Sequence, residues 1–459
     1  MKGKQPRKSL GLFVLMLLTI PLTALAGHEN YISGPLNSGP EVTAACLNCH
    51  EDAATDVMKT SHWNWNLKQT INGKEVDRGK KNAINNFCVS IDSNWPRCTS
   101  CHIGYGWEDA SFDFTDKTKV DCLVCHDTTG TYKKTATGAG HPDEVVDLVY
   151  VAKNVGTPSR FNCGSCHFFG GGGDAVKHGD LDSSIDYPER ETDVHMAVEG
   201  NDFTCQTCHA TENHEISGNA MVVSPSNQTH IGCESCHADP HAESLLNDHT
   251  AAVACQTCHI PTFAKQIPTK TSWDWSTAGQ DLEEAKDEHG KPTYMKKKGH
   301  FTWDKNIVPE YAWYNGTGGA YIPGDKINPD EMTLLSYPLG DINDPEAKIS
   351  PFKVHTGKQI YDTEHQYLIT PKVFGKDGYW KTFDWQSAAK LGMEASGLEY
   401  SGNYDFASTK MYWSINHMVS PKEQSLGCLD CHGDNGRLDW KALGYEGDPL
   451  RTGKSARLK

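Results

Sequence analysis

The longest apolar run of this chain extends from Leu10 to Leu25, near the N-terminus. No later segment approaches the length and hydropathy of a membrane span. Between residues 259 and 428 the density of glycine and proline predicts loops and short elements rather than long helices. The stretch 278–290 is rich in charged side chains and is expected to lie on the surface. We therefore predict a mainly α fold of short helices with much irregular chain.

Apolar side chains are too scarce for a conventional core. The residues A, V, I, L, M, F, W, Y and C make up only 37% of the chain, and a single core of this size would need more. The interior must then contain other apolar material. The region 261–427 is rich in tryptophan and tyrosine, which would either cover that material or form a surface for a partner.

Cysteine spacing identifies this material. The pattern Cys-x-x-Cys-His occurs eight times, so eight times two, or 16, of the 17 cysteines belong to it. The spacing is the attachment signature of c-type haem, in which two thiols bind one porphyrin and the histidine ligates its iron. A lone Cys-x-x-Cys could instead be a zinc site, a redox dithiol or a disulfide, but eight copies all followed by histidine favour haem.

The sequence thus predicts a multihaem cytochrome c built around eight covalent haems. The attachment cysteines are Cys46, Cys49, Cys98, Cys101, Cys122, Cys125, Cys163, Cys166, Cys205, Cys208, Cys233, Cys236, Cys255, Cys258, Cys428 and Cys431. The motif histidines are His50, His102, His126, His167, His209, His237, His259 and His432.

The N-terminus indicates export. Four basic residues precede the apolar run, and Ala24-Leu25-Ala26 is a small-residue cleavage site, so residues 1–26 are predicted to be a signal peptide. The alternative is an uncleaved anchor, but the run is short and is broken by Pro21. Covalent haem attachment also requires an exported chain. We expect a periplasmic protein that is not integral to the membrane.

Charge and motif spacing describe the whole chain. The net charge of −16 makes nucleic acid and anionic membranes poor partners, so we expect redox proteins as partners. An anionic substrate would need positive charge of its own at the site. Seven motifs lie in a haem-rich region, 27–260, and the haem-poor region 261–459 is closed by the eighth. We do not expect these regions to be independent domains.

Each motif supplies one axial ligand, so the other must come from elsewhere. An electron carrier would use a second histidine on every iron, whereas an enzyme would leave at least one iron open. Five histidines, among them His28, are expected to be surface or loop residues. The candidates for the second ligand are His62, His141, His178, His195, His214, His230, His241, His249 and His417.

Two features do not fit a simple electron carrier. Four glycines at 170–173 allow the backbone to approach a flat surface closely, and Lys177 follows them. A deprotonated lysine can bind iron, although a solvated lysine on a flexible loop is the simpler interpretation. Cys88, the seventeenth cysteine, is a reactive thiol, part of an intermolecular bridge, or an inert buried thiol.

Taken together, these motifs resemble the octahaem tetrathionate reductase family of periplasmic multihaem c-type cytochromes. The resemblance covers essentially the whole mature chain. Besides the eight pentapeptides it includes Gly39-Pro40-Glu41-Val42, His62-Trp63, the glycine run through Lys177-His178 to Asp180, Asp193-Val194-His195-Met196, and the segment from Val253 to Pro261.

The resemblance implies a catalytic haem attached at Cys98 and Cys101, with His102 and Lys177 as its ligands and Cys88 nearby. The other seven haems would have two histidine ligands each. The implied reaction is two-electron reduction of tetrathionate, a small inorganic anion, to two thiosulfates, with electrons from a periplasmic or quinol-linked donor. A calcium ion near the active haem, as in related enzymes, is compatible with the sequence.

Other functions remain open at this point. The family is also associated with nitrite and hydroxylamine reduction, although no Cys-x-x-Cys-Lys motif, typical of ammonia-forming nitrite reductases, occurs here. Octahaem enzymes that oxidise hydroxylamine cross-link a tyrosine to the haem, and this chain has 17 tyrosines. A non-catalytic electron carrier would have eight haems with two histidine ligands each.

Overall fold

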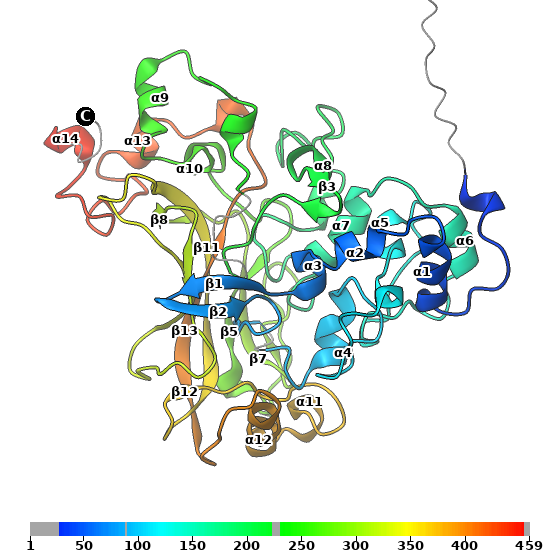
Figure 1. Cartoon of the computed structure of the whole chain (residues 1–459). Helices are drawn as coiled ribbons and strands as arrows, with labels where there is room; N and C mark the ends of the chain where they lie inside the picture. The colour runs from blue at the N-terminus through cyan, green and yellow to red at the C-terminus, as the bar shows by residue number, and fades with distance from the viewer. Residues whose placement is uncertain (1–26, 88–89, 223–229, 454–459) are drawn as a thin grey trace, which may run out of the picture.

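A computed structural model describes residues 27–87, 90–222 and 230–453 (Figure 1). The predicted signal peptide and Cys88 lie outside these ranges. Within them, no helix combines the length and hydropathy needed to cross a membrane. The chain forms a helical region around α1–α7, a central sheet, and a third group of short helices around α9, α10, α13 and α14 (Figure 1).

Short helices dominate the first half of the chain. Several are single turns built on the motifs, because two cysteines three residues apart share one face of a helical turn. Side-chain caps begin the longer ones: Ser38 accepts a hydrogen bond from the amide of Glu41, and Ser159 forms a capping box with Asn162. The helices are α1 (Gly39–Leu47), α2 (Ala53–Val57), α3 (Ser61–Asn64), α4 (Trp95–Cys98), α5 (Leu123–His126), α6 (Leu148–Lys153), α7 (Arg160–His167), α8 (Cys205–Cys208), α9 (Ser244–His249) and α10 (Cys255–His259).

Single 3-10 turns join these helices and recur later in the chain. They are η1 (His28–Asn30), η2 (Thr99–Cys101), η3 (Lys117–Lys119), η4 (Ser183–Ile185), η5 (Cys233–Ser235), η6 (Trp275–Thr277) and η7 (Lys422–Gln424). Two small hairpins also occur, β1 (Leu67–Ile71) with β2 (Lys74–Arg78), and β3 (Thr211–Glu212) with β4 (Glu215–Ile216).

A nine-stranded sheet fills the middle of the molecule, so the prediction of a mainly α fold is wrong. The strands run in the order β6-β7-β5-β11-β13-β10-β9, and β8 and β12 also pair with β11. They are β5 (Thr269–Asp274), β6 (Tyr294–Met295), β7 (Gly299–Asp304), β8 (Glu310–Tyr314), β9 (Gly318–Ala320), β10 (Thr333–Pro338), β11 (Lys348–Asp362), β12 (Tyr367–Leu368) and β13 (Tyr404–Ser414).

The antiparallel pair β11 and β13 forms the spine of this sheet. Its register runs from Phe352 opposite Ser414 to Asp362 opposite Tyr404. Along β13 the buried positions alternate with partly exposed ones, as expected for a strand. The glycines and prolines of this region, taken as signs of loops, lie largely in the connections between strands.

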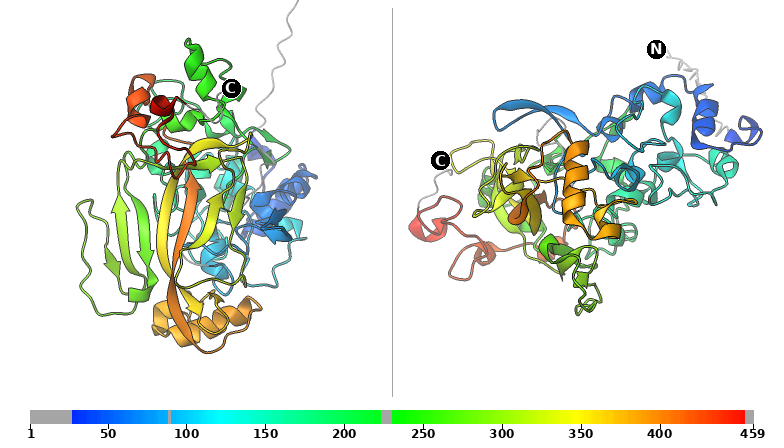
Figure 2. Two further views of the ribbon diagram at one scale, coloured as in Figure 1. Left: turned by 90° about the vertical axis from the view of Figure 1, so that its left-hand side faces the viewer. Right: turned by 90° about the horizontal axis from the view of Figure 1, so that it is seen from below.

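Two further helices cover one end of the sheet. They are α11 (Tyr379–Thr382) and α12 (Trp385–Ala395), which lie at the lower end of the strands in Figure 1 and are seen from below in Figure 2. Asp384 caps α12 by accepting from the amide of Ser387. Gly392 allows close packing, because a Cβ there would lie 1.8 Å from the carbonyl oxygen of Thr370.

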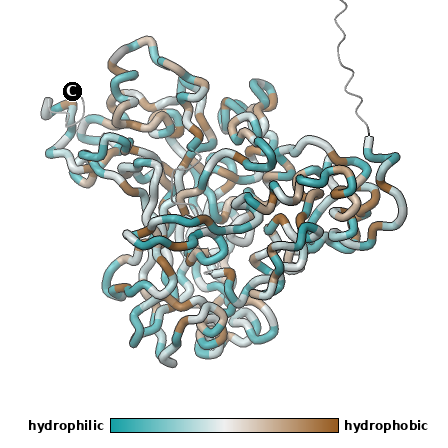
Figure 3. The backbone as a smooth tube through the Cα atoms, viewed as in Figure 1, coloured by the Kyte–Doolittle hydropathy of each residue, from teal (hydrophilic) through white to brown (hydrophobic). Residues whose placement is uncertain are grey.

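The last motif returns to the seventh. It forms α13 (Cys428–Cys431), followed by α14 (Pro449–Thr452), and the amide of Leu426 donates to the carbonyl of Cys258. Figure 3 shows that hydrophobic stretches along the backbone are short and interrupted by hydrophilic ones. This pattern agrees with an interior that the protein's own side chains do not fill alone.

Candidate haem and substrate site

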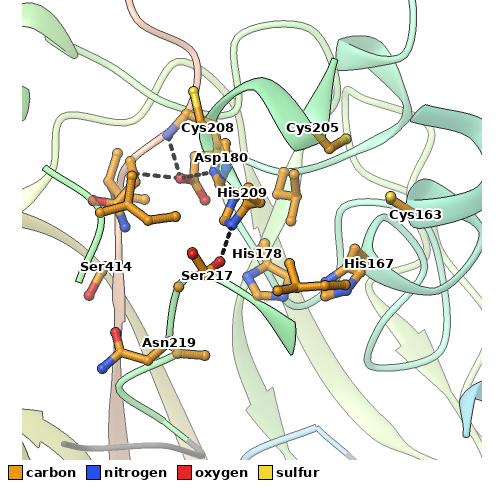
Figure 4. Close-up of a pocket in the computed structure, with 18 of the residues that line it drawn as sticks. Cys163, His167, His178, Asp180, Cys205, Cys208, His209, Ser217, Asn219 and Ser414 are labelled. Atoms are coloured by element: carbon orange, nitrogen blue, oxygen red, sulfur yellow. Dashed lines mark hydrogen bonds and ion pairs between the residues drawn. The ribbon is translucent and has the colours of Figure 1, made fainter. Parts of the chain in front are cut away.

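One continuous cavity, with a volume of about 3090 Å³, reaches every attachment motif. Each of the eight pentapeptides contributes at least one cysteine to its wall. The wall is completed by the sheet, through Phe352 on β11 and Trp413 on β13. Cys163, Cys205 and Cys208 can be followed around part of this space in Figure 4. The fold thus brings together motifs that are up to several hundred residues apart.

Seven motif histidines each face one other histidine. The ring centroids in each pair are 6.1–6.5 Å apart, too far for direct stacking. Two metal–imidazole bonds of about 2 Å each would fit between such rings. The pairs are His50 with His28, His126 with His214, His167 with His62, His209 with His417, His237 with His195, His259 with His241, and His432 with His249.

The two ring nitrogens of these histidines have different partners, as metal ligation requires. Six of them use Nδ1 for a hydrogen bond and leave Nε2 free to face the partner ring, an arrangement typical of ligating histidines. The acceptors are Gly156 O for His126, Ser217 O for His209, Leu245 O for His249, Asn247 Oδ1 for His241, Asp180 Oδ2 for His417 and Asp448 Oδ1 for His432.

Buried carboxylates fix two of these rings most firmly. Asp180 lies 3.1 Å from Nδ1 of His417 and also accepts from the amides of Asn416 and His417 (Figure 4). This pairing raises the pKa of His417 against the opposing effect of burial, which is the largest single influence. Asp448 lies 2.6 Å from Nδ1 of His432. A carboxylate behind a ligating imidazole makes it a stronger electron donor.

His102 departs from this pattern, and its role as an iron ligand stays a prediction. Its Nε2 lies 2.7 Å from the carbonyl oxygen of Trp63, and its Nδ1 has no hydrogen-bond partner in the described structure. The side chain is fully buried and does not line the cavity. Burial lowers its pKa to about 3. The imidazole is held away from the cavity because five aromatic rings surround it, those of Trp63, Trp65, Trp107, Phe112 and Phe114.

Lys177 lines the cavity, and its role as an iron ligand stays a prediction. Its Nζ lies 4.8 Å from the ring centroid of Trp413. The preceding loop turns sharply, with positive φ at Gly171 (+79°) and Gly172 (+99°), conformations that glycine adopts without strain. The third residue of the predicted catalytic set, Cys88, is not among the described residues.

Three candidate second ligands face no motif histidine among the described residues. His141 stacks on Tyr105 at 6.3 Å and does not line the cavity. His178 lines it and meets Trp413 edge-on at 4.9 Å, and burial holds its pKa well below the usual range. His230 lines the cavity as well.

Conversely, His28, which was expected to be a surface or loop residue, pairs with His50. Its closeness in sequence to the first motif was the available signal. As for the calcium ion, no group of three or more His, Cys, Asp or Glu side chains is arranged to hold a metal within the described ranges.

These features fit haem. Cysteine pairs and six of the seven imidazole pairs line one cavity. Outside its wall, the buried guanidinium of Arg78 leaves Nε and Nη1 without partners in the described chain. Burial also lowers the pKa of Arg78 to about 10.

Comparisons with known proteins agree. A family model described as bacterial cytochrome c matches residues 270–435, and one described as cytochrome c554 and c-prime matches residues 45–127. An uncharacterized protein of Archaeoglobus fulgidus is 26% identical over 231 residues, which are 39% of this chain and 77% of that protein. The crystal structure of an octahaem cytochrome c from Shewanella oneidensis is 62% identical, covers 93% of this chain and 98% of that chain, and superposes with a TM-score of 0.90. The chain therefore belongs to the octahaem c-type cytochromes and carries eight covalently bound haems.

Proposed function

We propose that this cytochrome is a periplasmic reductase that converts tetrathionate to two thiosulfates at the haem of Cys98 and Cys101. One observation carries the proposal. Seven motif histidines face a second histidine, whereas His102 is turned into an aromatic cluster and faces none in the described chain. An enzyme of this class requires haems with two histidine ligands for electron transfer and one haem whose iron can still bind substrate.

In this proposal Lys177, rather than His102, is the protein ligand of the catalytic haem. Lys177 reaches the cavity from which His102 is excluded. With Lys177 as its one protein ligand, the iron would keep a position available to substrate. This differs from the sequence-based expectation, in which both residues ligate the same iron.

The cavity offers positive charge to a dianion. Lys80 and Lys134 line it together with Lys177. Lys134 donates to the carbonyl of His102, but its ammonium also forms a buried ion pair with Asp121 at 2.9 Å and so adds no net positive charge. The Nζ of Lys80 lies 3.9 Å from the ring centroid of Trp65. The charge of Lys80 opposes the repulsion that the net charge of −16 exerts on an anion.

The chemistry is balanced without a proton. When bound, the haem supplies redox-active iron at this position. Two electrons enter the central sulfur–sulfur bond of tetrathionate, the bond breaks, and each thiosulfate leaves with a share of the added pair. Trp413 and Phe87 line the cavity wall, and the ring of Trp413 lies under the amine of Lys177. The electrons would come from a periplasmic or quinol-linked donor.

Replacement of Lys177 tests the proposal. In Lys177→Met, we expect the spectrum of one haem in eight to change and tetrathionate reduction by a reduced dye to fall at least tenfold. Lys376→Met, which alters an exposed lysine, is the control. An unchanged spectrum and rate in Lys177→Met would rule out the assignment. Rates with nitrite and hydroxylamine, measured in parallel, decide whether tetrathionate is the preferred oxidant, and no turnover with any of them would indicate an electron carrier.

A further inference from the structure

A buried lysine on the central sheet holds the backbone that presents Lys177. Lys353 lies on β11 with its side chain fully buried. Its Nζ donates to the carbonyl oxygen of Val176 at 3.1 Å and to that of Lys177 at 3.0 Å. The third proton of the ammonium goes to Oγ1 of Thr269 at 2.6 Å. All three donors of this group are therefore satisfied by the segment and by its neighbour on β5.

Thr269 completes the same set of contacts. Its hydroxyl oxygen lies 2.6 Å from the carbonyl oxygen of Ala175 and 3.1 Å from that of His178. Because the hydroxyl has one proton, it donates to one of these at a time, with the shorter contact favoured. Four consecutive carbonyls, from residues 175 to 178, thus point toward Lys353 and Thr269. The side chains of Lys177 and His178 both line the cavity instead.

Packing alone does not explain a lysine at this position. Burying an ammonium costs free energy that an apolar side chain of similar length would not incur. By contrast, Lys358 on the same strand is exposed, so its ammonium stays in water and carries no such cost. Lys353 is instead matched to the carbonyls that it meets, which indicates that holding them is its role.

The segment needs such support. It follows four glycines at 170–173, which leave the chain flexible. Ala175 has φ +60°, a left-handed conformation that costs an alanine free energy. Contacts from the sheet would keep the segment in this conformation, and the amine of Lys177 would otherwise sample several positions.

We propose that Lys353, acting with Thr269, is a positioning residue for the catalytic haem. It fixes the backbone of residues 175–178 so that the amine of Lys177 is presented at one place in the cavity. This inference rests on the proposed ligand role of Lys177, and the two are tested separately.

The test compares the holoprotein with Lys353→Met and Thr269→Val, using hydrogen exchange of the 170–180 backbone and the electron paramagnetic resonance spectrum of the catalytic haem. We expect at least tenfold faster exchange in both variants, and a catalytic haem signal that splits into several species. Thr269→Ser keeps the hydroxyl and should behave as wild type. Lys358→Met, on the same strand, should change neither readout.

The outcomes separate the two proposals. If Lys177→Met alters the haem signal while Lys353→Met and Thr269→Val leave exchange and signal unchanged, the positioning role is overturned and the ligand role stands. If Lys177→Met leaves the signal unchanged, the ligand role fails and the positioning role toward the haem fails with it, whatever the exchange rates. Should Lys353→Met fail to fold, the Thr269→Val and Thr269→Ser pair still decides the matter.

Discussion

The imidazole rings of His28 and His50 lie with their centroids 6.2 Å apart and their planes inclined by 30°. His28 belongs to η1, at the beginning of the described chain, and His50 closes the first motif. The amides of Tyr31 and Ile32 both donate to the carbonyl of His28, which fixes its backbone. The first residues after the predicted leader therefore lie beside the first attachment motif.

His28→Ala should expose one iron. If His28 is the second ligand of the first haem, its removal opens a coordination position, and one haem in eight should become high-spin in the ferric state. Electron paramagnetic resonance of the oxidised protein measures this change. His289→Ala, at an exposed position, is the matched control and should leave the spectrum as in wild type. Spectra that cannot be told apart would remove His28 from the ligand set.

Asp448→Asn should raise the reduction potential of the last haem. Its carboxylate lies 2.6 Å from Nδ1 of His432 and supplies negative charge behind the ring. Without that charge the imidazole donates less to iron, which stabilises the reduced state. Spectroelectrochemical titration should show one component moved to higher potential. Asp434→Asn removes the same charge from an exposed position nearby and should have the smaller effect; an equal effect would contradict the explanation.

Asp182→Asn should stabilise the protein at neutral pH. Burial raises the pKa of Asp182 to about 6 from its ordinary 3.8, so the folded protein binds this proton more readily than the unfolded chain does. The charged carboxylate therefore lowers the free energy of unfolding. This cost is absent below pH 3.8, grows as the pH rises to about 6, and is complete above that value. Asparagine can still accept from the amide of Ser184, which Asp182 caps.

We expect a gain of about 2 kcal/mol in the free energy of unfolding at pH 7.5, shrinking toward zero as the pH falls to 4. Urea unfolding of the holoprotein at several pH values measures it. Asp377→Asn, at an exposed site, should give no such pH-dependent difference. A gain that persists unchanged at pH 4 would show that the charge of Asp182 is not the cause.

Asn94→Ala should destabilise the junction between the helical region and the sheet. The buried amide nitrogen of Asn94, with two protons, lies within hydrogen-bond distance of the carbonyls of Ser90, Asp92 and Pro371, and its oxygen accepts from the amides of Val373 and Phe374. Loss of these bonds leaves several buried groups unpaired, at a cost of about 3 kcal/mol. Thermal unfolding of this variant and of the exposed Asn343→Ala would measure the difference.

The sequence located the haem attachment sites because their chemistry is local. A cysteine, two spacers, a cysteine and a histidine lie within one turn, and no long-range contact is needed to recognise them. The pairing of histidines is different: His167 meets His62, and His209 meets His417, across long stretches of chain. Only the folded structure decides such partners.

The central sheet was missed for a related reason. Along β13 the buried residues Ala407, Thr409, Met411 and Trp413 alternate with less buried ones, a signal that periodicity could have found. Pro351 and Gly357 lie within β11, although residues of these two types usually indicate loops. The orientation of His102 was not accessible at all, because it depends on aromatic residues that approach from other segments, such as Trp63 and Trp107.

The strand β11 also sets a length constraint on the protein. Near its beginning, Ile349 exchanges hydrogen bonds with Ala252 and Ala254 beside the seventh motif, and four residues later Lys353 reaches the Lys177 segment. Since alternate residues of a strand face opposite sides, deleting one residue between them would turn Lys353 to the other face of the sheet. Insertions and deletions should therefore be tolerated in the exposed 281–290 connection but not in these few residues of β11.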